Sequence, residues 1–170
     1  MPQTLTTKIA LIVNALLQNT VGAANVPGLI DRNYQISLAN GTGANQADRV
    51  YSASITLAAS ATQDIDLAGV LTDIFGAIVT FARIKAIAIS ALAANTNNVV
   101  LGAAAANAFV GPFGSATHTI AVKPGGLFID VAPDATGWAV TAGTADQLRV
   151  GNSAGGSSVT FEIILIGASA

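Results

Sequence analysis

The longest stretch without turn-forming residues covers positions 78–92, which contain no Gly, Pro, Asn or Asp. Six of its fifteen residues are β-branched, and branching at Cβ suits a pleated strand better than a helix. Read with a period of two, both faces are mostly apolar, which is typical of a strand covered on each side. We therefore predict a central buried strand here, although its Ala, Arg, Lys and Leu residues leave a helix open.

Shorter segments with alternating apolar and polar positions predict further strands along the chain. Turn residues separate them; in Lys123-Pro-Gly-Gly126, for example, Pro fixes φ and Gly supplies positive φ. Asn-rich residues 95–98 predict a hairpin between the central strand and the next one. No alternation of strands with helices is visible, so the pattern indicates an all-β fold, an antiparallel β-sandwich resembling a jelly roll. The further predicted strands cover residues 34–38, 50–57, 62–67, 99–101, 117–122, 127–131, 138–142, 147–150 and 158–166.

The N-terminal residues 1–33 differ from the rest of the chain. An apolar, β-branched segment is followed by residues 18–33, which read as a turn-rich connection because they contain Pro27 and two glycines. We interpret residues 1–33 as an N-terminal arm or first strand with a linker, and residues 34–170 as the sandwich domain. The candidate intersubunit arm, expected to add a strand to a neighbouring sheet, consists of Lys8, Ile9, Leu11, Val13, Leu16 and Leu17. An ordinary edge strand and a weak signal-peptide pattern are the alternatives.

The low content of charged residues favours some kinds of binding partner and argues against others. Only 9% of the 170 residues are charged, the net charge is −2, and Cys is absent. A weakly charged surface docks easily onto other protein surfaces. The seven basic residues form no cluster, which argues against nucleic-acid binding. No apolar window is long enough for a membrane-spanning helix, and the glycines of residues 39–48 lack the Lys of a phosphate-binding loop, so no cofactor is expected.

Few side chains offer candidate chemistry. Asp64 and Asp66 share the polar face of a predicted strand and could bind a hard cation, but no calcium-binding loop surrounds them and we favour a solvated face. His118, the single histidine, lacks an evident nucleophile and acid, so we interpret it as structural. Trp138 is expected in the core. The sequence therefore predicts no catalytic residue, no metal ligand and no enzyme.

Several segments resemble structural proteins of tailed bacteriophages and prophages. The resemblance extends over roughly residues 37–170 and does not include residues 1–33. The segments that carry it are residues 37–48 and 56–67, Leu71-Thr-Asp-Ile-Phe-Gly76, Asn107-Ala-Phe-Val-Gly-Pro-Phe-Gly114, Val122-Lys-Pro-Gly-Gly126, Ala132-Pro-Asp-Ala-Thr-Gly-Trp138 and Ile166-Gly-Ala-Ser-Ala170.

The resemblance implies a virion component made in the bacterial host cytoplasm. The expected function is that of a capsid decoration (cement) protein, which binds the outside of the shell and stabilises it. The expected partners are the major capsid protein and further copies of the chain, with a homotrimer expected by analogy to threefold positions on a shell. The alternative is a tail, fibre or receptor-binding module in which Trp138, Tyr34 or Tyr51 would stack on a carbohydrate.

Overall fold

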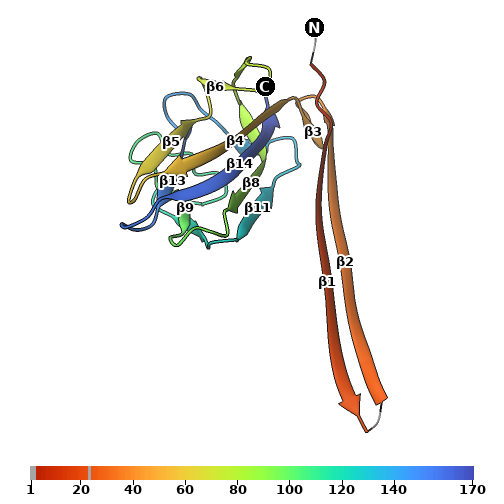
Figure 1. Ribbon diagram of the computed structural model, residues 1–170. Coiled ribbons are helices and arrows are strands. Elements are labelled where there is room, and N and C mark those ends of the chain that lie inside the picture. Colours follow the sequence, from red (N-terminus) through yellow and green to blue (C-terminus); the bar gives the residue numbers. More distant parts are fainter. Residues whose placement is uncertain (1–2, 23) are drawn as a thin grey trace.

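The computed structural model describes residues 3–22 and 24–170, and these residues form strands without any helix. Most strands form a body, from which one long hairpin projects (Figure 1). The prediction of an all-β protein is therefore confirmed. The strands are β1 (Thr7–Val21), β2 (Ala24–Asn40), β3 (Gln46–Ala47), β4 (Arg49–Leu57), β5 (Thr62–Asp66), β6 (Leu71–Thr72), β7 (Ile78–Val79), β8 (Arg83–Ala91), β9 (Val99–Gly102), β10 (Thr119–Val122), β11 (Leu127–Val131), β12 (Trp138–Ala139), β13 (Gln147–Asn152) and β14 (Val159–Ala168).

The body consists of two antiparallel sheets. One has the order β11-β8-β14-β4, with β12 also paired to β8, and the other has the order β10-β9-β13-β5. Four of the pairs are nested: β4 pairs with β14, β5 with β13, β8 with β11, and β9 with β10. Two further pairs, β8 with β14 and β9 with β13, complete the two sheets. This nesting wraps one long antiparallel ribbon into two layers and is compatible with the predicted sandwich.

The main core lies between the two sheets because the inward side chains of both strand sets are apolar. Ile87 and Ile163 come from the first sheet, and Leu101 and Leu148 from the second; all four are completely buried. Burial of each such side chain contributes about 1.5–3 kcal/mol. The outward positions of the first sheet are smaller or more polar, so this sheet has one buried and one largely open face.

The predicted continuous strand over residues 78–92 is wrong in its first part. β7 ends at Val79 and β8 begins at Arg83, while the Phe81 N–H donates to the Leu67 carbonyl outside either main sheet. The Phe81 ring is buried beside Gly167, where a Cβ would lie 2.6 Å from it. The strand that local propensity predicts is thus interrupted where Phe81 packs into the interior.

The predicted hairpin between the central strand and residues 99–101 is also wrong. β9 pairs with β10 and β13 in the second sheet, whereas β8 belongs to the first. The connecting loop is held to the opposite end of the chain by Asn97, whose amide nitrogen lies 2.9 Å from the Asn152 side-chain oxygen and 3.2 Å from the Ser157 carbonyl. These contacts explain why an Asn-rich segment crosses between the sheets here.

The N-terminal region forms a hairpin rather than a strand followed by a linker. β2 begins at Ala24 and runs to Asn40, so most of residues 18–33 are paired and the expected boundary at residue 33 falls inside this strand. Pro27 and Gly28 lie within β2, where they do not create a turn. A proline is tolerated in this strand because the hairpin is an isolated edge whose outward N–H groups need no partner.

Candidate interaction arm

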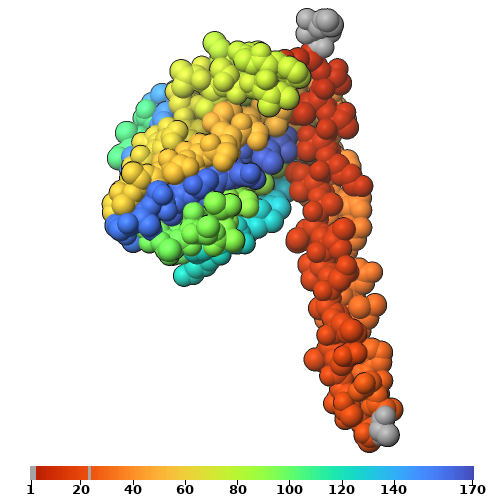
Figure 2. All heavy atoms as spheres, in the orientation of Figure 1, coloured from red at the N-terminus to blue at the C-terminus, as the bar shows by residue number. Residues whose placement is uncertain are grey.

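The arm, defined as β1 and β2, is a ribbon of two antiparallel strands. Fifteen residues of β1 pair in unbroken register with β2, from Thr7 opposite Leu38 to Val21 opposite Ala24. At roughly 3.3 Å per residue the ribbon is about 50 Å long. Figure 2 shows that most of this length extends beyond the body as a narrow rod.

The two faces of the arm differ in polarity. Because cross-strand partners lie on the same face, the register assigns every side chain to one side. The face that contains Ile9, called the apolar arm face below, carries a single charged residue, Arg32, while the opposite face is mixed and carries Lys8 and Asp31. The apolar arm face consists of Thr7, Ile9, Leu11, Val13, Ala15, Leu17, Asn19 and Val21 with Ala24, Val26, Gly28, Ile30, Arg32, Tyr34, Ile36 and Leu38.

The arm root is fixed to the open face of the first sheet. Leu38 is completely buried and belongs to a small second core with Ala86 and Ile166 of the sheet. Backbone contacts add to this packing: the Asn45 N–H donates to the Pro133 carbonyl at 2.7 Å. The body therefore sets the direction in which the arm leaves, through a second hydrophobic cluster that is separate from the main core.

Beyond the root, the described part of the chain leaves most apolar side chains of the arm uncovered. Leu17 is 77% exposed, and Leu11, Ile30 and Tyr34 are also exposed. An isolated two-stranded hairpin is only marginally stable in water, and contiguous exposed apolar surface marks interaction sites. The arm therefore presents an exposed apolar surface of the kind that marks interaction sites.

An apolar groove lies where the arm meets the body. It has a volume of about 350 Å³ and is bounded by the arm on one side and by β11 on the other. β11 is the edge strand of the first sheet, and Leu127 and Ile129 on it are exposed. The groove continues the apolar arm face onto the body. The residues that line it are Ile9, Leu11, Tyr34, Ile36, Leu127, Ile129 and Val131.

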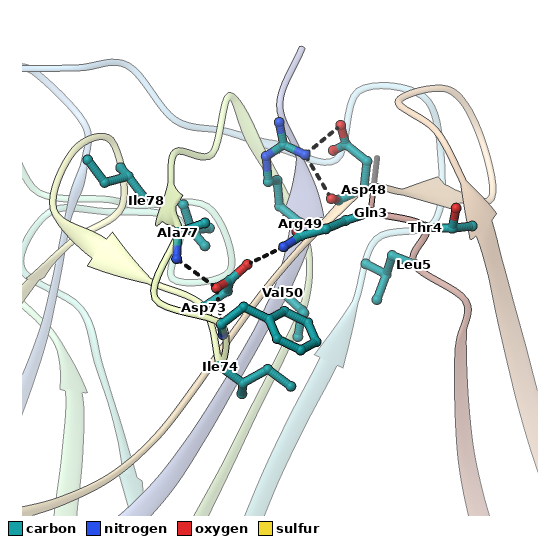
Figure 3. Close-up of a pocket in the computed structure, with 12 residues that line it drawn as sticks. Gln3, Thr4, Leu5, Asp48, Arg49, Val50, Asp73, Ile74, Ala77 and Ile78 are labelled. Atoms are coloured by element: carbon teal, nitrogen blue, oxygen red, sulfur yellow. Dashed lines mark hydrogen bonds and ion pairs between the residues drawn. The ribbon is translucent and has the colours of Figure 1, made fainter. Parts of the chain in front are cut away.

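A second hollow, of about 470 Å³, lies between the N-terminal segment and the β6–β7 turn (Figure 3). One of its two acidic residues, Asp73, accepts hydrogen bonds from the backbone N–H groups of Ala77 and Phe75, at 2.9 and 2.8 Å, and from the Gln3 side chain. These bonds, that from Ala77 foremost, lower the pKa of Asp73. Its carboxylate is thus occupied as a turn cap and is poorly placed to act as a general base.

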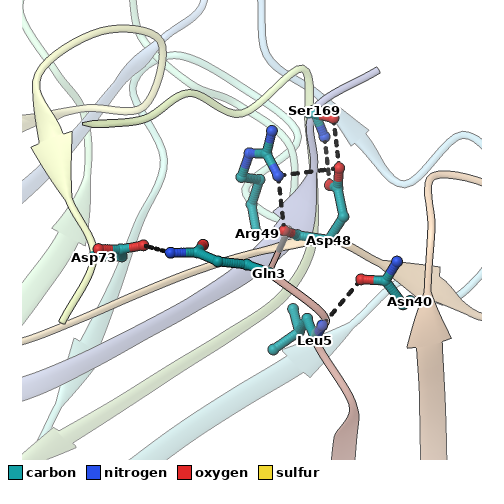
Figure 4. A network of polar contacts seen from close by, with 7 residues as sticks. All are labelled: Gln3, Leu5, Asn40, Asp48, Arg49, Asp73 and Ser169. Carbon is teal, nitrogen blue, oxygen red and sulfur yellow. Dashed lines mark hydrogen bonds and ion pairs between the residues drawn. The ribbon is translucent and has the colours of Figure 1, made fainter. Parts of the chain in front are cut away.

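The neighbouring polar groups are likewise paired with one another (Figure 4). Asp48 accepts hydrogen bonds from the Ser169 N–H at 2.8 Å and its hydroxyl at 2.6 Å, and pairs with Arg49 at 3.2 Å. The Leu5 N–H donates to the Asn40 side chain at 2.9 Å. These contacts tie the N-terminal segment and the C-terminal residues to the arm root, and their arrangement is that of a structural joint.

The predicted arm residues lie on both faces of the ribbon. Ile9, Leu11, Val13 and Leu17 belong to the apolar arm face, while Lys8 and Leu16 belong to the opposite one. Sequence reasoning predicted the last part of β2 as a strand over residues 34–38, but missed residues 24–33 of this strand, which include the lone Arg32, and its pairing with β1. The signal was present in the alternation of residues 30–38, but the turn residues before it concealed the pairing.

The other singled-out residues are dispersed over the body. Asp64 forms a bidentate ion pair with Arg149, at 2.7 and 2.8 Å, while Asp66 accepts a hydrogen bond from the Ala68 N–H. Among the described residues, no group of three His, Cys, Asp or Glu side chains could hold a metal ion. His118 is exposed, with its Nδ1 2.9 Å from the Phe113 carbonyl oxygen.

The aromatic residues considered for carbohydrate stacking do not gather on one surface. Trp138 and Tyr51 are partly buried and pack against the main core, and desolvation raises the pKa of the Tyr51 hydroxyl. Tyr34 is exposed, on the arm. The three rings therefore form no common stacking platform.

Comparison with known proteins adds no relative. No family model matches the chain, and no match is found among curated proteins or solved structures. In the part of the chain that the structure describes, no helix is long and apolar enough to cross a membrane.

Proposed function

We propose that the chain is a non-enzymatic structural subunit of a tailed-bacteriophage virion, a capsid decoration protein that binds the outside of the shell and is held in the assembly through its arm. The observation that carries this proposal is the arm itself, a fixed ribbon about 50 Å long whose apolar face is uncovered in the single chain. The partners of this proposal are the major capsid protein and further copies of the chain.

The body supports the same proposal. Its nested strand pairs, in two sheets of four main strands, have the pairing order that a jelly roll requires, and we infer that topology. Jelly-roll domains occur in viral capsids, and the segments that resemble phage structural proteins lie in the body except for residues 37–40, which form the end of β2. The resemblance supplies the phage assignment, while the arm supplies the reason to expect a subunit of an assembly.

The tail or receptor-binding alternative has less support from the geometry. It requires exposed aromatic rings that can stack on a sugar, and the partly buried Trp138 and Tyr51 are poor candidates. Tyr34 is exposed, but it lies among aliphatic side chains in the groove. This environment favours a protein segment as the occupant.

Copy number in purified virions tests the proposal. Quantitative mass spectrometry against the major capsid protein should give hundreds of copies in a simple ratio to the shell protein. A few to a few tens of copies would place the chain on a tail or vertex, and absence from the particle would refute a virion role.

A shortened arm tests whether the arm holds the chain in the assembly. Residues 13–32 are replaced by Asn-Gly, a two-residue hairpin turn, between the paired Ile12 and Asn33. The buried root is retained, so the body should fold as before. Binding to undecorated shells, measured by co-sedimentation, should fall at least tenfold, the equivalent of about 1.4 kcal/mol. Undiminished binding would refute the role of the arm.

A further inference from the structure

The open face of the first sheet offers a second uncovered surface, called the platform below. It begins beside the arm root and continues along β14, β8, β4 and β11. Its side chains are small or apolar with one exception, Glu162, which is exposed. Ile164 and Ile129 are also exposed on it, although both are large aliphatic residues. By the register, the platform consists of Ser52, Ser54, Ala88, Ser90, Leu127, Ile129, Glu162 and Ile164.

We propose that the apolar arm face of one copy packs on the platform of a second copy of this chain. Both surfaces are present on every copy, and the groove joins them into one continuous apolar corner. The inference rests on the proposed function, because it names the partner that the arm takes within the assembly.

Charge complementarity favours this occupant. Arg32 is the single charged residue on the apolar arm face and Glu162 the single charged residue on the platform. Among the described residues, neither forms an ion pair with another side chain. A charge covered by apolar surface is costly unless an opposite charge meets it. When the arm of one copy packs on the platform of another, Arg32 and Glu162 can form an ion pair with each other.

The same charge argues against packing of arms on arms. If parallel arms met around a symmetry axis through their apolar faces, the Arg32 side chains would lie at the same level and repel one another. An arm on a platform avoids this repulsion. It also joins two different surfaces, so each copy donates one arm and receives another. The exchange closes as a reciprocal pair about a two-fold axis or as a small ring.

The available area is sufficient for a specific complex. The arm is two strands wide, about 10 Å, and the platform extends roughly 25 Å along β14. An arm on a platform therefore covers about 250 Å² on each partner, and a reciprocal pair buries on the order of 1,000 Å² in total, the lower limit for a specific interface. The exchange is thus expected to be stable but concentration-dependent.

Charge reversal tests the contact in the purified full chain. Sedimentation analysis should show a dimer or small ring that dissociates on dilution. Arg32→Glu and Glu162→Arg should each weaken self-association at least tenfold, and the double exchange should restore most of it. Lys8→Glu is the matched control: it makes the same change of charge on the opposite arm face and should leave self-association within about twofold of the original.

Cross-linking between separate chains identifies the two residues that meet. Because the sequence contains no Cys, only the introduced cysteines can react. A chain carrying Arg32→Cys is mixed with one carrying Glu162→Cys, and a short bis-maleimide should join the two. Lys8→Cys in place of Arg32→Cys should give little product. A monomeric chain, or cross-linking that occurs only within a chain carrying both cysteines, would overturn the proposal.

The outcomes separate this inference from the proposed function. If the chain is a monomer in solution but is present in hundreds of copies per virion, the exchange of arms is refuted and the decoration role is retained. The apolar arm face would then pack on the shell protein. An arm-exchanged oligomer absent from virions would retain the exchange and refute the decoration role.

Discussion

Truncation of Leu38 to alanine should detach the arm from the body without disturbing the main core. The Leu38 side chain is completely buried in the second cluster, against Ala86 and Ile166. Leucine-to-alanine changes in cores cost about 2–5 kcal/mol, and less where the site can relax. Here the neighbours Ile9 and Ile36 are only partly buried, so water or a small shift can fill the space. We therefore expect a loss of about 2–3 kcal/mol.

Urea unfolding, followed by circular dichroism, measures this loss. With a slope of roughly 2–3 kcal/mol per molar, the midpoint should fall by about 1 M. Hydrogen exchange should locate the change in the arm root, and not in β13 of the second sheet, which has no residue in this cluster. Leu17→Ala is the control: because Leu17 is 77% exposed, it should change stability by no more than about 0.5 kcal/mol. Equal losses for the two variants, or no loss for Leu38→Ala, would refute the idea that this cluster anchors the arm.

Three further changes test the body. Hydrogen bonds, led by the one from the Thr136 hydroxyl, hold the pKa of Asp134 at about 2, below its ordinary 3.8. The ionised Asp134 carboxylate makes its full contribution to stability above pH 3.8, and this contribution is lost as the pH falls toward 2. In acid-unfolding curves, the difference in stability between the original chain and Asp134→Asn should therefore disappear over that pH range. Asp64→Asn removes a partly exposed ion pair with Arg149 and should cost about 0.5–1 kcal/mol, a loss that shrinks in 1 M salt if screening governs the pair; a salt-independent loss would refute that explanation. Gly111→Ala places a Cβ 2.6 Å from the β-carbon of the single tryptophan and should lower the thermal midpoint, with a cost of about 1–3 kcal/mol; an unchanged midpoint would show that the loop has room to move.

The sequence predicted the body best where burial determines the pattern. The strand predicted over residues 158–166 is found as β14 (Val159–Ala168), which lies between β8 and β4. Alternation likewise located β4, since its inward and outward side chains have different surroundings. In such strands each side chain is either buried or exposed, so the local pattern of apolar and polar residues is enough to predict the strand and its buried face.

Pairing between distant segments could not be read in the same way. The arm was not recognised as a hairpin because Pro27 and Gly28 are turn residues in most settings, and an uncovered ribbon imposes no burial pattern to outweigh them. The interruption before β8 places Phe81 beside Gly167, which is far away in the sequence, so the local pattern does not contain it. The apolar arm face and the platform became visible only when the register showed that Arg32 and Glu162 stand alone on their surfaces.

The construction of the arm root affects the order of events during synthesis. The arm is translated before the body, but two residues that fix its root are translated much later. Ile166 completes the second cluster, and Ser169 donates a hydrogen bond to Asp48. At about 5–20 residues per second, roughly 6–26 s separate the translation of Leu38 from that of Ile166. For this interval a nascent ribbon with two open edges has no anchor, and such edges are sites of misassembly. Nascent chains that are close to one another are therefore expected to misassemble through their arms unless chaperones, or wide spacing of ribosomes on the mRNA, separate them until β14 is in place.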